Sequence, residues 1–180
     1  INSMALKIFK IHHSGSHDLF NQMVKIPDLV INFSVTKPSH VFIMGSVGYA
    51  HRKIPLDVST KSKSEIRDLK NRYGQNLTEY AIGIVGRLEH IDENNSRIWI
   101  KGSKWGINIS SGSDHYGVIP ISGYLEVNPG NHEISYWAEA HTDAPGAYSH
   151  PAEIQGTDDT NLPGGTSDPY NQLIIRIEEK

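Results

Sequence analysis

The chain has 180 residues, of which 37% are hydrophobic and 21% charged, and its formal net charge is −3. This length fits one domain with a sizeable core, and the composition is neither that of a disordered chain nor that of a membrane protein. The weak negative charge gives no attraction to nucleic acid, and the absence of cysteine excludes disulfides, thiolate metal sites and cysteine nucleophiles.

The start of the chain looks like a cloning remnant. Residues 1–3 precede Met4, where we expect the native start, and no signal-like apolar core follows. No apolar run approaches the roughly 20 residues that cross a bilayer. We therefore expect no membrane insertion, and the sequence leaves the location open, with a virion or a cell surface as one option.

Short runs of alternating apolar and polar residues predict strands along most of the chain. Residues 29–35 and 41–49 are separated by a short loop with Pro38, which favours an antiparallel pair. Residues 117–140 form the clearest hairpin, because Pro129 presets φ and Gly130 supplies a positive φ in the turn between two apolar runs. The apolar run around residues 172–178 predicts a final strand.

Two segments depart from the strand pattern. Ile66, Leu69 and Tyr73 recur at helical spacing behind Ser62 or Ser64 as possible N-caps, so we expect a short helix or ordered excursion near residues 62–74. Residues 142–169 contain few aliphatic side chains and many Gly, Pro, Asp and Ser residues. They predict one long loop, and loops of that length in compact domains are usually functional or mobile.

These patterns together favour an all-β fold. The chain offers about eight to ten short strands with turn signals between them, as in sandwiches and barrels. A parallel α/β sheet needs alternating helices, which the pattern lacks. Because no linker or repeat interrupts the chain, we expect residues 1–180 to form a single domain, an antiparallel β-sandwich of the jelly-roll type.

Three stretches resemble the trimeric jelly roll of complement component one q globular heads and tumour necrosis factor. They are residues 29–49 as early strands, residues 123–134 as a late hairpin ending in Pro-Gly-x-His-x-Ile, and residues 173–177 as the terminal strand. Phage and bacterial surface fibres carry similar domains. The resemblance covers less than half of the chain and implies a homotrimer with a binding or adhesive role, not an enzyme.

Histidine is unusually frequent, with ten residues in the chain. Histidine is the commonest metal ligand. His141 and Asp143 are two residues apart, so a strand would place both on one face, and His150 follows in the long loop. These three residues are the candidate ligands of a divalent metal. An exposed polar loop explains the same residues without any cofactor.

Aromatic side chains concentrate in the second half of the chain. A sugar ring can stack on such rings, while nearby polar groups bind its hydroxyls. Trp105, Tyr148 and Tyr170 are flanked by Gly, Ser and Pro, and recognition often involves loops. With His141 and Asp143, they form the predicted ligand-binding set for carbohydrate or protein.

No catalytic motif stands out, and no Gly-x-Ser-x-Gly elbow occurs. The sequence therefore favours a non-enzymatic recognition or structural domain that assembles as a homotrimer and binds carbohydrate or protein through residues 142–169. A purely structural fibre subunit without a ligand shares this fold. The alternative is a metal- or carboxylate-dependent polysaccharide hydrolase or lyase, for example with Glu126 beside Glu133 or Glu139.

Overall fold

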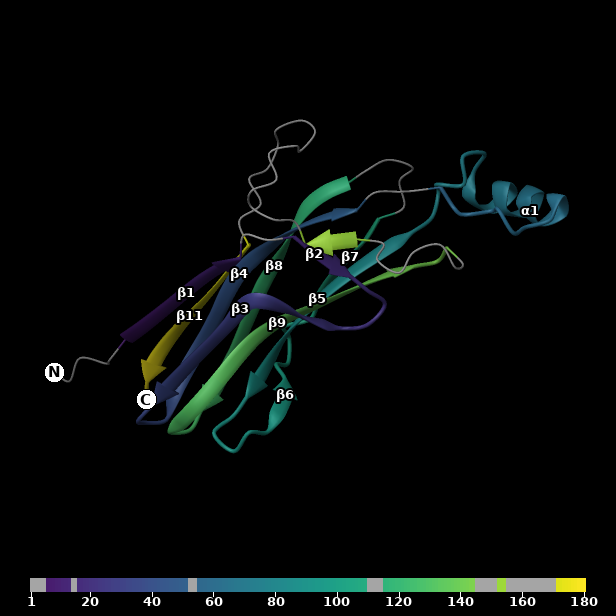
Figure 1. Cartoon of the computed structure of the whole chain (residues 1–180). Coiled ribbons are helices and arrows are strands. Elements are labelled where there is room, and N and C mark those ends of the chain that lie inside the picture. The colour runs from purple at the N-terminus through teal and green to yellow at the C-terminus, as the bar shows by residue number, and fades with distance from the viewer. Residues whose placement is uncertain (1–5, 14–15, 52–54, 110–114, 145–151, 155–170) are drawn as a thin grey trace.

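The computed structural model describes residues 6–13, 16–51, 55–109, 115–144, 152–154 and 171–180. Within these ranges the chain forms eleven strands and one helix (Figure 1). The helix is α1 (Lys63–Tyr73). The strands are β1 (Leu6–His13), β2 (His17–Leu19), β3 (Val24–Val35), β4 (Ser39–His51), β5 (Ile82–Ile91), β6 (Arg97–Trp99), β7 (Trp105–Ile109), β8 (His115–Val127), β9 (Gly130–Thr142), β10 (Ala152–Ile154) and β11 (Asn171–Glu179).

The strands form two antiparallel sheets. In the first, which we call the β4 sheet, β8 pairs with β4 on one side, while β11 and then β10 pair with it on the other. Strands β1 and β2 complete this sheet beyond β11 and β10. In the second, the β5 sheet, β9 lies between β3 and β5, and both β6 and β7 pair with the other side of β5.

The chain passes repeatedly from one sheet to the other. Strands β3, β5 and β9 belong to the β5 sheet, whereas β1, β4, β8 and β11 belong to the β4 sheet. Such alternation between two packed antiparallel sheets is consistent with a jelly roll. The predicted all-β sandwich is therefore confirmed.

Both predicted hairpins are wrong, because each pair of strands divides between the sheets. Strand β3 pairs with β9 and not with β4, and β8 pairs with β4 and not with β9. Only Asn128 and Pro129 separate β8 from β9. Three peptide units cover about 10 Å, which is the spacing of packed sheets. The turn was correctly placed, but a turn this short also fits an arch between sheets, which we call the β8–β9 arch.

The core lies between the sheets, since each long strand turns alternate side chains inward. Leu173, Ile175 and Ile177 of β11 are at most 1% exposed, and Ile134 and Tyr136 of β9 are equally buried. This period of two predicts the other face of each strand to be outward. It therefore decides which side chains the sandwich presents to its surroundings.

Helix α1 lies beyond the end of the sandwich, opposite the end that holds the C-terminus (Figure 1). Its start is a capping box, in which the Ser62 hydroxyl accepts a hydrogen bond from the Glu65 amide and the Glu65 carboxylate accepts one from the Ser62 amide. Gly74, with φ of 78°, ends it. The predicted helix is confirmed. No helix in the described ranges is long and apolar enough to cross a membrane.

Gly86 and Tyr136 form a tight inward contact between β5 and β9. A Cβ atom at position 86 would overlap the Tyr136 hydroxyl. That hydroxyl is buried and has no hydrogen-bond partner among the described residues. Tyr136 therefore contributes through its ring, and position 86 has no room for a side chain.

We expect Gly86→Ala to lower the free energy of unfolding by about 1 to 3 kcal/mol, because it overpacks the core. Tyr136→Phe is expected to change stability little or to raise it, since it removes an unpaired buried hydroxyl. Adding Tyr136→Phe to Gly86→Ala should recover part of the loss. Urea unfolding of the four proteins of this cycle measures these terms, and strict additivity would contradict the proposed contact.

Candidate functional site

The predicted site residues divide into two groups. Tyr148, Tyr170 and His150 lie outside the described residues. His141 is in β9, and its Nε2 atom is 3.3 Å from the Oε1 atom of Glu139. In the described ranges, no group of three or more His, Asp or Glu side chains is arranged to hold a metal ion. The metal site that requires His150 stays a prediction.

Asp143 has a structural partner. Its Oδ1 atom accepts a hydrogen bond of 2.9 Å from the Ala81 amide, and its backbone carbonyl accepts one of 3.0 Å from the Tyr73 hydroxyl. The neighbouring Thr142 hydroxyl donates to the Ala81 carbonyl at 3.0 Å. Because Tyr73 is the last residue of α1, these bonds tie the segment after β9 to the helix and to the beginning of β5. The prediction of one uninterrupted loop over residues 142–169 is wrong, because Thr142 belongs to β9 and Ala152–Ile154 form β10.

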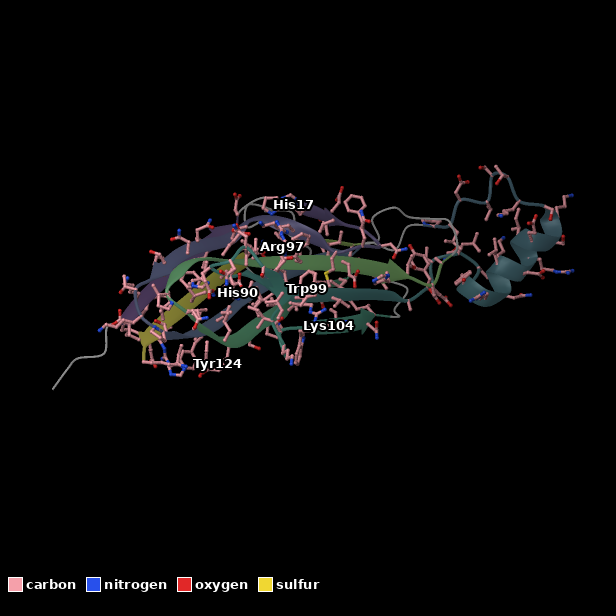
Figure 2. The ribbon with its side chains drawn as sticks, turned by 90° about the horizontal axis from the view of Figure 1, so that it is seen from below. His17, His90, Arg97, Trp99, Lys104 and Tyr124 are labelled. Atoms are coloured by element: carbon pink, nitrogen blue, oxygen red, sulfur yellow. The ribbon has the colours of Figure 1, made fainter. Side chains whose placement is uncertain are left out.

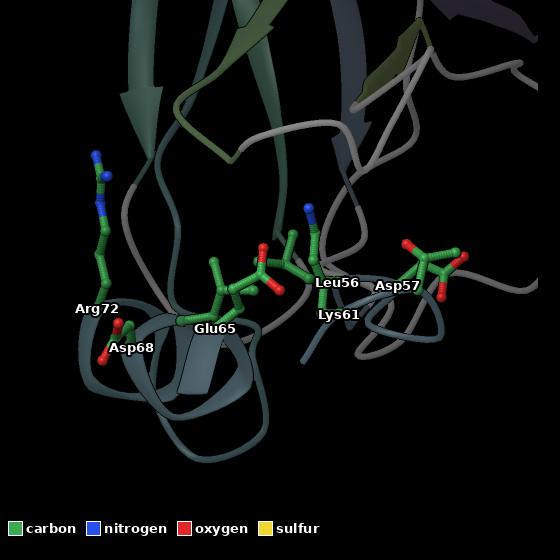
Figure 3. A pocket seen from close by; sticks show the side chains of 8 residues that line it. Leu56, Asp57, Lys61, Glu65, Asp68 and Arg72 are labelled. Atoms are coloured by element: carbon green, nitrogen blue, oxygen red, sulfur yellow. The ribbon is translucent and has the colours of Figure 1, made fainter. Parts of the chain in front are cut away.

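A pocket of about 530 Å³ lies beside α1. Figure 3 shows that its side chains come from the helix and from the segment before it. They combine three carboxylates, two cations, a hydroxyl and two leucines: Leu56, Asp57, Thr60, Lys61, Glu65, Asp68, Leu69 and Arg72. A pocket with both charges and an apolar part fits a small polar ligand.

Two of the pocket carboxylates already bind backbone amides. Asp57 accepts a hydrogen bond from the Ser59 amide, and this bond is the main reason why the pKa of Asp57 lies below its usual value. The bond from the Ser62 amide lowers the pKa of Glu65 in the same way. Both groups therefore stay ionised at neutral pH and shape the segment that leads into α1.

The outward face of the β4 sheet is unusually apolar. We call it the β4-sheet face. Eight large apolar side chains of the described residues are exposed, and five of them lie on this face. These five are Leu6 (55% exposed), Ile8 (64%), Met44 (50%), Val118 (50%) and Tyr124 (47%). Met44, Val118 and Tyr124 alternate with core-facing residues of β4 and β8, and Leu6 and Ile8 alternate with the partly buried Phe9 and Ile11 of β1. The strand period therefore places all five on one side.

Strand register brings the apolar side chains of this face together. Ile8 pairs with Arg176, Arg176 with Phe42, and Phe42 with Tyr124, in one row across four strands. The Arg176 guanidinium lies 4.7 Å from the centre of the Phe42 ring, and the rings of Phe42 and Tyr124 are 5.2 Å apart. Met44 lies in the next row. This row and Met44 form the centre of an apolar patch, and Val118 lies two rows farther along β8.

One end of the β4-sheet face is polar. The Tyr124 hydroxyl donates to Glu126 at 3.2 Å and lies 2.7 Å from Nδ1 of His40. The Lys180 ammonium donates to the other Glu126 oxygen at 2.6 Å and is the main cause of the lowered pKa of that carboxyl. Figure 2 labels Tyr124 at this end. Acidic and basic groups thus border the apolar patch.

A tryptophan cluster on the outward face of the β5 sheet was not anticipated. The Trp99 and Trp137 rings meet edge to face at 5.7 Å, and the Arg87 guanidinium lies 5.0 Å from the centre of the Trp99 ring. Strand β5 separates the two tryptophans in the sheet, so only the pairing reveals their contact. Trp105, a predicted ligand-binding residue, lies in β7 and is 54% exposed.

The suggested carboxylate pair of Glu126 and Glu133 does not form across a hairpin. Glu126 is in the β4 sheet opposite His40, whereas Glu133 is in the β5 sheet and binds Lys25 at 2.6 Å. The β8–β9 arch separates the two strands into different sheets. Glu139, in the same strand as Glu133, has His141 as its neighbour.

The comparisons with known proteins give little guidance. No protein family and no curated protein matches the chain. Among solved structures, one match is a structure of infectious bursal disease virus, Gx strain, with 9% identity and a TM-score of 0.42. It covers 97% of this chain, and this chain spans 36% of that one. Values this low carry no argument about function, and the fold assignment rests on the strand pairing above.

Substitutions at Asp143 test its structural role. Asp143→Ala should lower the free energy of unfolding by about 1 kcal/mol, because the Ala81 amide loses its acceptor. Asp143→Asn keeps an oxygen in the same place and should keep most of that stability. Thermal unfolding measures both variants, and an equal loss in Ala and Asn would show that the charge, not the hydrogen bond, matters.

Proposed function

We propose that this protein is a non-enzymatic, self-associating β-sandwich domain whose copies pack together through the β4-sheet face. The observation that carries the proposal is the gathering of exposed apolar side chains on this face, around the row of Ile8, Phe42 and Tyr124. Large exposed apolar patches bordered by polar groups mark interaction sites. Burial of Ile8, Met44 and Tyr124 against another copy would remove them from water and stabilise the assembly.

Two edge strands of the described sheets are poorly suited to pairing with another molecule. Strand β8 is an edge of the β4 sheet and contains Pro120, which has no amide hydrogen to donate. Strand β3 is an edge of the β5 sheet, contains Pro27, and shifts register with β9 between Lys25 and Val30. Prolines and irregularities at edges oppose pairing with a strand of another molecule.

The polar end of the β4-sheet face suits a second copy of the same chain. It carries the carboxylate of Glu126 beside the ammonium of Lys180, with His40 next to them. A surface with both signs of charge can complement itself when two copies are related by a rotation. An apolar centre with a polar border is also the usual anatomy of a protein interface.

We further propose that the assembly is a homotrimer and that it binds a ligand. The resemblance to the complement and tumour necrosis factor jelly roll supports three copies. The end that bears α1, its pocket and the anchored Asp143 is remote from the C-terminus (Figure 1). The α1 end is the part of the domain that we assign to carbohydrate or protein binding, as in a lectin-like or adhesive fibre domain.

Charge placed in the patch tests self-association. Met44→Glu and Tyr124→Glu should each raise the dissociation constant at least about 100-fold, because each buries a carboxylate in the interface. Ile98→Glu is the matched control, since Ile98 is 58% exposed on the other sheet. Light scattering gives the molar mass of each protein. A monomeric wild type, or an assembly that survives both substitutions, would contradict the proposal.

Trp105 provides a test of the ligand. If carbohydrate binds at this exposed ring, Trp105→Ala should weaken binding up to about 10-fold, as loss of a stacking contact predicts. Ile98→Ala serves as control, because it removes another exposed apolar side chain from the same sheet. Binding is measured on a glycan array with the assembled protein. An array on which no glycan gives a signal would contradict carbohydrate binding.

A further inference from the structure

Two histidines from neighbouring strands meet inside the sandwich. His90 of β5 is 6% exposed and His132 of β9 is 4% exposed. The Nε2 atom of His90 is 3.1 Å from the Nδ1 atom of His132, and the ring centres are 5.2 Å apart. The Phe33 ring covers the other side of His132 at 5.3 Å. Figure 2 labels His90 within the sandwich.

The hydrogen bonds fix which nitrogen carries each hydrogen. The Nε2 atom of His132 is 2.8 Å from the Asn128 carbonyl, which can only accept, so Nε2 of His132 donates. In neutral His132 the Nδ1 atom is then an acceptor. His90 must donate to it from Nε2. The pair in its neutral form therefore has one arrangement of hydrogens.

This pair fastens the β8–β9 arch to the rest of the β5 sheet. Asn128, which accepts from His132, also donates through its side chain to Glu93 at 2.9 Å. A Cβ atom at Gly130 would lie 2.6 Å from the Glu93 Cβ, so the arch packs closely against the turn after β5. His90 of β5 thus contacts His132 of β9, His132 contacts Asn128 of the arch, and Asn128 contacts Glu93 in the turn after β5.

Protons change this chain of contacts. The pair can take up one proton and keep both hydrogen bonds. His132 then donates from both nitrogens, while His90 carries its hydrogen on Nδ1 and accepts on Nε2. A second proton gives both rings a hydrogen on the facing nitrogens, 3.1 Å apart. The bond between the rings is then lost, and two positive charges face each other in a buried place.

We propose that the His90–His132 pair is an acid-sensitive latch that holds the β8–β9 arch against β5 and releases it when both imidazoles are protonated. The latch does not need the self-association proposed above. It requires only the pair, the arch and the surrounding burial.

The groups around the latch limit how readily it opens. Burial is the main cause that lowers the pKa of His90, and the charge of His132 adds to it. Asp92 and Glu93, in the turn after β5, oppose this by favouring a positive charge. From β3 the facing residue is Phe33, which has no charge, and from the arch it is the Asn128 carbonyl. Among the described residues these two carboxylates are therefore the charged groups that act on the pair.

The lowered pKa sets the direction of the pH effect. An unfolded histidine takes up its proton near about pH 6.5, whereas His90 in the folded chain takes it up at lower pH. Below about pH 6.5 the unfolded state therefore binds more protons. The contribution of His90 to stability is complete above that pH and is lost as the pH falls toward the folded pKa.

His90→Gln is the variant that separates the latch from other effects. The glutamine side-chain amide can still donate to Nδ1 of His132, but it does not titrate. Melting temperatures are compared at about pH 7.5 and about pH 5.5, a range above the usual titration of carboxylates. The wild type should lose at least about 2 °C more than His90→Gln between the two pH values.

Two further measurements make the test decisive. His141→Gln, in which the histidine is exposed, should keep the full wild-type loss. An NMR titration of the unaltered protein should show His90 taking up its proton below about pH 6.5, with the amide signal of Gly130 shifting at the same midpoint. An equal loss in the wild type and His90→Gln, or a Gly130 signal that ignores the titration, would overturn the latch.

Discussion

The pairing of β4 on both sides is the constraint on which the rest of the structure depends. β8 follows β4 from Ser39 to His51, and β11 and β10 share its other side. A strand paired along both sides cannot slip by one residue without exchanging its buried and exposed faces. Val41, Ile43 and Val47 therefore stay in the core. The same register fixes Phe42 and Met44 outward, so the fold and the apolar patch have one cause.

The stability of a single copy does not explain why the β4-sheet face carries exposed apolar side chains. A lone sandwich needs one apolar face per sheet, yet β4 and β8 also carry large apolar side chains on their outward face. Side chains such as Met44 and Tyr124 would remain half exposed in water on a monomer, where they contribute little burial. The β5 sheet differs, because its outward aromatic residues pack on each other and on Arg87. The β4 sheet, and not the β5 sheet, therefore has outward apolar side chains that association would bury.

The sequence was informative wherever the signal is local. Strand periodicity predicted the sandwich, and the helical spacing between a serine cap, at Ser62 or Ser64, and Gly74 predicted α1. The predicted hairpins failed because a two-residue turn at Asn128 has the same residues whether it reverses within a sheet or crosses between sheets. The β4-sheet face and the His90–His132 pair were missed for a related reason, since both depend on which strands become neighbours. The proposed metal and ligand residues beyond Ala144 lie outside the described residues, and they stay predictions.

The arch connects the two proposals. β8 carries Tyr124 and Glu126 to the β4-sheet face, and it ends at Val127, next to the Asn128 carbonyl that His132 binds. Association through that face would hold the end of β8 in place and so favour the closed latch. Linkage is reciprocal, so a closed latch must favour association by the same free energy. Acid that opens the latch would then weaken the assembly even though neither His90 nor His132 lies on its surface.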